Sequence, residues 1–111
     1  MPSVRTSRDI FDKVVLDAVE AIDDRWHRQL GLVEFAVEET PILPADWGAP
    51  TVPLATLVPA TGSSPARIVM FRRPIELRCE TTEDLMALVR TVLVEQIAAV
   101  LGRSPEDIDP D

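Results

Sequence analysis

The chain has 111 residues, the length of one domain, and leaves no room for a second. Hydrophobic residues make up 46% and charged residues 27%, a balance that excludes disordered and fibrous proteins. Nineteen acidic against eleven basic residues give a net charge of −8, which argues against nucleic acid and anionic membrane surfaces as partners.

Cys79 is the single cysteine, so no disulfide can form within the chain, as is usual in a reducing compartment. Pairing of Cys79 with His27 as nucleophile and base lacks any orienting motif, and a lone cysteine is commonly a small buried hydrophobe. The charged amino terminus has no signal-peptide core, and polar residues interrupt the most apolar stretch, 85–101. We therefore expect a cytoplasmic protein without a membrane span.

Residues 7–30 are predicted to form the first helix. Thr6 and Asp9 have the spacing of a capping box at its start, and Gly31 is a typical helix stop. Apolar residues recur between them at the spacing of one helical face: Ile10, Phe11, Val14, Val15, Ala18, Val19 and Ile22.

Residues 32–38 alternate between apolar and acidic side chains, which predicts a strand with one face in water. Residues 41–66 hold six of the ten prolines, which excludes a helix and predicts a long loop with at most a short edge strand over 54–58. Loops of this length are often binding segments or lids. Trp47 lies in this loop and is a candidate partner contact, although covering the core is the commoner role of a lone tryptophan.

Residues 67–72 contain a continuous apolar run, which is expected of a strand covered on both faces. Arg72, at the end of this strand, is a further candidate binding residue. Pro74 should end the regular strand pairing, because proline lacks the backbone N–H that pairing requires.

Residues 82–101 are predicted to form the second long helix. Thr81 and Asp84 repeat the spacing of a capping box, and Gly102 is the expected stop. A short turn opens at Ser104, and residues 103–111 as a whole are expected to be an acidic tail in solvent. A calcium site in this tail is the alternative, but the glycine and spacing of known calcium loops are missing.

The order helix, strand, loop with a short strand, strand, helix predicts a single α+β domain over residues 1–111, with residues 1–6 as a tail. In this architecture two long helices pack on a small mixed β-sheet. Gln96 conflicts with the simple form of this fold, since it falls inside the apolar face of the second helix. It is either a core amide hydrogen-bonded to nearby backbone or a sign that the helix faces a polar cleft.

Several short segments, in a matching order over most of the chain, resemble the small single-domain zincin-like metallopeptidases. They are FDKVV at 11–15, VEFAVEE at 33–39, LP at 43–44, IVMFRRPIE at 68–76, LVR at 88–90 and GRSPEDI at 102–108. The resemblance implies a zincin-like minimal fold, in which an active-site helix packs under a short mixed sheet.

The motif of that family is HExxHxxGxxD, in which two histidines and the aspartate bind zinc and the glutamate polarises water. When the motif is aligned on Gly102, the histidines fall on Glu95 and Ala99. The glutamate of the motif falls on Gln96 and its aspartate on Pro105. Only the glycine is retained.

A register shifted by one residue keeps Glu95 as the glutamate but places Val94 and Ala98 at the histidines and loses the glycine. In either register the side chains cannot bind zinc as the motif does, and glutamine cannot act as a general base. His27 is the only histidine of the chain. The resemblance therefore implies a degenerate member that has lost its zinc and holds no other cofactor.

Two classes of function follow. The first is a catalytically inactive homologue that binds a peptide or protein, with Glu95, Gln96, Trp47 and Arg72 as candidate binding residues, or that is vestigial. The alternative is a hydrolase or metalloenzyme with a non-standard site built around Glu95. Self-association as a homodimer, through a strand edge or exposed loop residues, is a third hypothesis.

Overall fold

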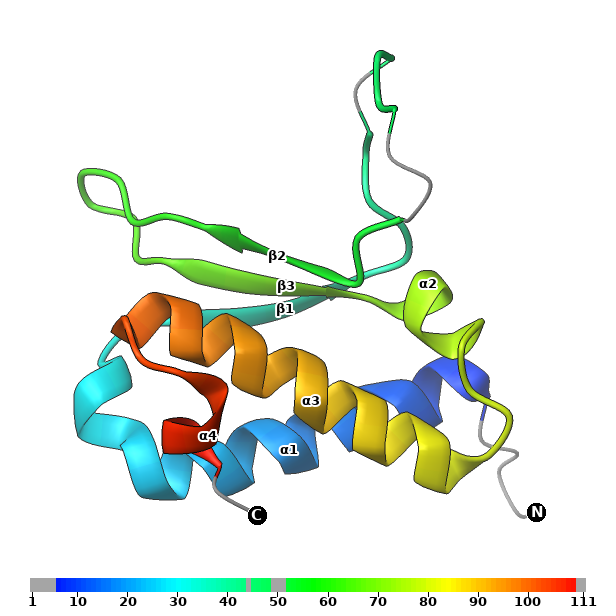
Figure 1. Cartoon of the computed structure of the whole chain (residues 1–111), viewed down its shortest axis with the longest axis horizontal. Coiled ribbons are helices and arrows are strands. Elements are labelled where there is room, and N and C mark those ends of the chain that lie inside the picture. The colour runs from blue at the N-terminus through cyan, green and yellow to red at the C-terminus, as the bar shows by residue number, and fades with distance from the viewer. Residues whose placement is uncertain (1–5, 44, 49–51, 110–111) are drawn as a thin grey trace.

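The computed structural model describes residues 6–43, 45–48 and 52–109, which form two layers. A three-stranded sheet is one layer, and the two long helices are the other (Figure 1). The elements in chain order are α1 (Ser7–Leu30), β1 (Glu34–Glu38), β2 (Ala55–Val58), β3 (Arg67–Phe71), α2 (Arg72–Glu76), α3 (Thr82–Leu101) and α4 (Pro105–Ile108). The predicted α+β architecture is confirmed.

The two long helices begin and end where the sequence predicts. Thr6 accepts a hydrogen bond from the Asp9 N–H at 3.1 Å, and the Asp9 carboxylate accepts one from the Thr6 N–H at 3.2 Å. Thr81 and Asp84 form the same capping box at α3. Gly102 ends α3 with φ +65°, a left-handed conformation that a side chain would strain.

The sheet has the strand order β1-β3-β2, with β1 parallel and β2 antiparallel to β3, so it is mixed as predicted. Its central strand β3 is the most buried, and Ile68 and Met70 are fully buried in the core shared with the helices. Val69 and Phe71, on the alternate positions, are 4% exposed. The prediction made from the continuous apolar run, a strand buried on both faces, is therefore confirmed.

The short helix α2 corrects the expectation at the end of β3. Arg72, expected as the last strand residue, is instead the first residue of α2. Pro74 lies in the first turn of that helix, where a missing backbone N–H is tolerated because it has no intrahelical acceptor. A helix this short has no periodicity to reveal it.

The sequence suggested that the carboxyl-terminal segment is a tail in solvent. This holds for residues 103–107, which are exposed, but Ile108 and Asp109 are packed against the rest of the protein. Ile108 is 1% exposed, and its carbonyl accepts a hydrogen bond from the Trp26 indole at 3.0 Å. Arg103 lies over the same indole ring, 5.2 Å from its centroid. The side chain of Asp109 is only 10% exposed and is paired with Arg90. Residues 110–111 lie outside the described ranges.

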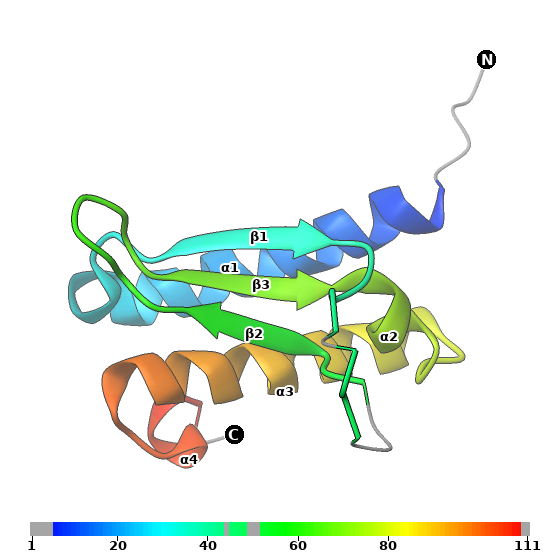
Figure 2. The same cartoon turned by 90° about the horizontal axis from the view of Figure 1, so that it is seen from above.

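The residues predicted as a proline-rich loop include β2, the short edge strand expected at 54–58. Seen from above, β2 lies over α3 and β1 lies over α1 (Figure 2). None of the helices in the described ranges is long and apolar enough to cross a bilayer.

Candidate functional site

The carboxyl-terminal half of α3 carries the positions aligned with the metallopeptidase motif. Glu95 and Ala99 are both exposed and lie one turn apart on one face of α3, because residues four apart in a helix are neighbours. Gln96, next to this face, is half-buried. Pro105 is exposed and begins α4, three residues after the Gly102 cap.

The shifted register falls on the buried face of α3, about 100° around the helix. Val94 is 6% exposed and Ala98 is 2% exposed, and both belong to the hydrophobic core. Both side chains are almost completely buried, which would restrict the access of water and substrate to a metal held there, although Val94 also borders the pocket beside α4.

Gln96 is not a buried core amide. Its side chain is half-buried and makes no hydrogen bond within the described part of the chain. The expected hydrogen bond to neighbouring backbone is therefore absent in this part of the structure, and water can reach the amide instead.

A pocket of about 480 Å³ lies beside α3 and α4. Its lining residues are Ala87, Arg90, Thr91, Val94, Glu95, Pro105, Glu106 and Asp109. Two aligned motif positions, Glu95 and Pro105, thus face one pocket, whereas Gln96 and Ala99 do not line it.

The residues at the four aligned positions do not fit a zinc ion. Glu95 is the only one with a side chain of the kinds that usually bind zinc, and a zinc site needs at least three protein ligands. Across the ranges that the structure describes, no group of three His, Cys, Asp or Glu side chains is placed to hold a metal.

The outer edge of β2 runs along the same side of the molecule as α3 (Figure 2). The Phe71 N–H donates to the Leu54 carbonyl at 2.9 Å, so this pair is hydrogen-bonded in the antiparallel ladder. Pairs alternate along such a ladder, and therefore the N–H and C=O groups of Ala55 and Leu57 point away from β3. These groups are available to another extended chain.

Arg72 is a structural residue rather than an accessible binding residue. It is 8% exposed, and every nitrogen of its guanidinium donates a hydrogen bond. The acceptors are Glu39 after β1, Glu76 in α2 and Ser7 at the start of α1. The hydrogen bond from Arg72, helped by nearby positive charge, lowers the pKa of Glu39 below its usual value. Arg72 therefore joins α2 to the start of α1 and to the segment after β1, and described residues already engage four of its five N–H groups.

The other candidates stand apart from one another. Trp47 is 43% exposed and does not cover the core, so a role as a partner contact stays a prediction. Burial raises the pKa of Cys79, whose thiol donates to the Ile75 carbonyl at 3.4 Å. His27 lies in the last turn of α1, and that end of α1 and α2 are at opposite ends of the molecule (Figure 1). No thiol–imidazole pair forms.

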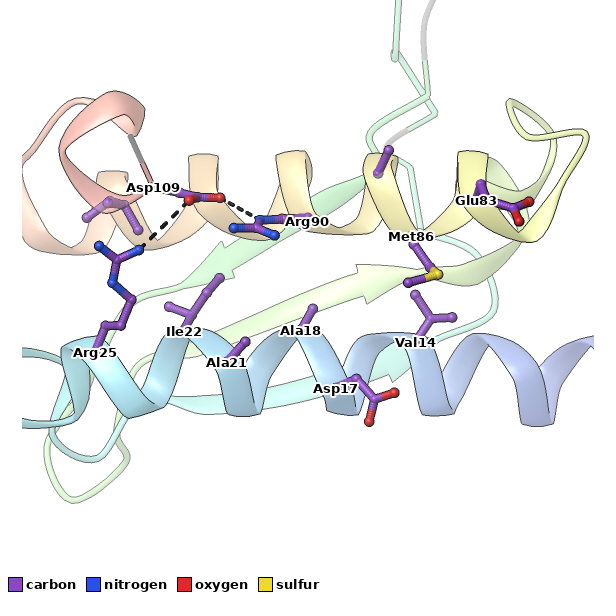
Figure 3. Close-up of a pocket in the computed structure, with 12 residues that line it drawn as sticks. Val14, Asp17, Ala18, Ala21, Ile22, Arg25, Glu83, Met86, Arg90 and Asp109 are labelled. Atoms are coloured by element: carbon purple, nitrogen blue, oxygen red, sulfur yellow. Dashed lines mark hydrogen bonds and ion pairs between the residues drawn. The ribbon is translucent and has the colours of Figure 1, made fainter. Parts of the chain in front are cut away.

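A feature that sequence reasoning missed is a pocket of about 580 Å³ between α1 and α3 (Figure 3). It opens on the side of the helix layer away from the sheet. The sequence carried only a weak signal for this pocket. Ala18, Ala21 and Ala87 line it, and their small side chains leave the space between the two helices unfilled.

A sequence model described as a zincin-like metallopeptidase matches residues 30–111. The match begins at the end of α1 and includes all three strands, α3 and α4. No curated protein matches the chain.

Proposed function

This chain belongs to the zincin-like metallopeptidase family, and on that premise we propose that it is a non-catalytic member that binds an extended peptide along the open edge of β2. One observation carries the loss of catalysis. The positions that supply the zinc ligands and the general base are Glu95, Gln96, Ala99 and Pro105, and these residues cannot assemble that chemistry.

The burial pattern of α3 supports the alignment on Gly102. Ligands of a catalytic metal must be accessible to water, and Glu95 and Ala99 are both exposed. The shifted register would need ligands at Val94 and Ala98, which are in the core. On this proposal, the helix that would carry the site is retained, whereas its metal ligands, and with them the zinc cofactor, have been lost.

The peptide-binding role is supported by the geometry of β2. Strand addition requires unpaired N–H and C=O groups on an accessible edge, and Ala55 and Leu57 provide them. Thr56 and Val58 are exposed on the alternate positions. Exposed Glu95 on the neighbouring helix and the net charge of −8 favour peptides with basic side chains.

The test uses the full chain and random heptapeptides displayed on phage, followed by titration of the selected peptides. Ala55→Pro removes one outward N–H without touching the ladder to β3, and it should weaken binding by about tenfold or more. Ala60→Pro, the same substitution at an exposed residue after β2, is the matched control and should bind normally. Equal binding by both variants would refute the β2 site.

Catalysis is tested separately. Refolded with zinc, the protein should hold no stoichiometric metal and cleave no peptide; metal binding together with hydrolysis would overturn the proposal. The alternative, an enzyme built around Glu95, draws on the 480 Å³ pocket that Glu95 lines. A hydrolytic activity abolished by Glu95→Gln, with unchanged thermal unfolding, would favour that enzyme.

A further inference from the structure

The groove between α1 and α3 exposes apolar side chains to water. Its floor is formed by Val14, Ala18, Ala21, Ile22, Met86 and Ala87. Met86 is 55% exposed, and Ala21 and Ala87 are exposed as well. Figure 3 shows side chains of both helices pointing into this space, with the sheet behind them. A groove of this kind is a candidate contact surface.

Apart from Asp109, the charged residues that line the groove are separated by sign, and Asp17 is also paired with Lys13 of its own helix at 3.1 Å. Asp17 on α1 and Glu83 on α3 precede Arg25 and Arg90 on the same helices. Both helices run in the same direction, so the acidic residues lie toward one end and the arginines toward the other (Figure 3). Asp109 lies between the two arginines, with Arg90 at 2.5 Å and Arg25 at 4.0 Å.

We propose that this groove is the contact surface of a homodimer in which α1 packs antiparallel against α1 of a second copy. A two-fold axis perpendicular to the helices exchanges the two ends of the groove, so Asp17 meets the partner's Arg25 and Arg25 meets the partner's Asp17. This charge complementarity is what selects a second copy as the occupant. A two-fold axis along the helices would instead set Asp17 against the partner's Glu83.

Small side chains at the centre of the contact fit the same arrangement. Ala21 lies midway between Asp17 and Arg25 in the sequence, so it falls at the two-fold axis. The absence of a long side chain there allows the two helices to approach. Met86 and the groove alanines would be removed from water, which is the main driving force for association. This dimer is independent of peptide binding at β2.

Sedimentation velocity over a concentration series tests the proposal on the full chain. The wild type should show a concentration-dependent dimer, and Ala21→Arg, which places like charges on the axis, should raise the dimer dissociation constant by about tenfold or more. Leu16→Arg is the control, because Leu16 is 56% exposed on α1 but does not line the groove; its dimer should be unchanged. Circular dichroism melting shows that each variant is folded.

A covalent readout checks the geometry. In a Cys79→Ala background, Ala21→Cys should form a disulfide-linked dimer under mild oxidation, because the two residues face each other across the axis. Leu16→Cys should form no disulfide-linked dimer. A wild type that stays monomeric at every concentration, or a dimer insensitive to Ala21→Arg, would contradict the proposal; a dimer lost instead in Ala55→Pro would place the contact at the β2 edge.

Discussion

At the scale of single residues, Arg72 is the one charged side chain that is buried among the described residues. A buried guanidinium is costly unless its charge is paired and its donors are satisfied. The acceptors are Glu39 in the segment after β1, Glu76 in α2 itself and Ser7 at the start of α1. Arg72 therefore fixes the end of β1, α2 and the start of α1 relative to one another.

The pairing with Arg72 makes stability depend on pH. The folded pKa of Glu39 is lowered, so its contribution is fully present above the unfolded value near 4.5 and is lost as pH falls through the folded pKa. Between about pH 6 and about pH 3, the wild type should lose more free energy of unfolding than Glu39→Gln does. Urea titrations at each pH measure this difference; parallel curves for the two proteins would rule out the assignment.

At the scale of elements, α3 has two chemically different faces. The core side carries Leu93 and Ile97, both fully buried, while the face of Glu95 and Ala99 is open to water. The helix thus retains the layout of a site helix, with its ligand positions accessible, although the ligating side chains are absent.

Restoring those side chains should restore metal binding. The quadruple variant Glu95→His, Gln96→Glu, Ala99→His and Pro105→Asp supplies two imidazoles one turn apart on the exposed face and the carboxylate of the third ligand position. It should bind one zinc per chain where the wild type binds none. Calorimetric titration and metal analysis measure this.

The matched control puts the histidines in the shifted register. Val94→His with Ala98→His buries both imidazoles, which should lower the stability by about 2–4 kcal/mol without creating a zinc site. Tighter zinc binding by the control than by the quadruple variant would show that the alignment on Gly102 is wrong.

At the scale of the whole molecule, α4 closes the helix layer. The fold is a two-layer sandwich in which the helices cover one face of the sheet (Figure 1). Ile108 fills the end of the core, and its carbonyl is held by Trp26 on α1. Ile108 and Asp109 therefore connect α1 and α3 through their contacts with Trp26 and Arg90.

Truncation of this anchor tests its role. Ile108→Ala should cost about 2–5 kcal/mol, because it leaves a cavity among fully buried side chains. Ile42→Ala, at a side chain 98% exposed, should change the stability by less than about 0.5 kcal/mol. Chemical denaturation followed by tryptophan fluorescence measures both; equal effects would mean that α4 does not support the core.

Local signals in the sequence were sufficient for the long elements. The capping boxes of Thr6 and Thr81 and the glycine stops need only residues within one or two turns, so the bounds of α1 and α3 could be predicted. The apolar run of β3 likewise indicated a strand buried on both faces, which agrees with its central place in the sheet. By contrast, α2 is a single turn, and its first residue, Arg72, is held by partners distant in sequence.

By itself, the sequence determined the fold class, the two long helices, the family resemblance and the lack of zinc-ligating residues at the motif positions. The helices and the fold class follow from periodicity and capping, the resemblance from short segments in a matching order, and the missing ligands from residue chemistry; all of these are local properties. Only the tertiary structure decided that Glu95 and Ala99 share an exposed face and that Arg72 is paired with Glu39 and Glu76. It also decided that a groove with a charged rim lies between α1 and α3. Burial and pairing depend on residues brought together from distant parts of the chain, and no local pattern contains that information.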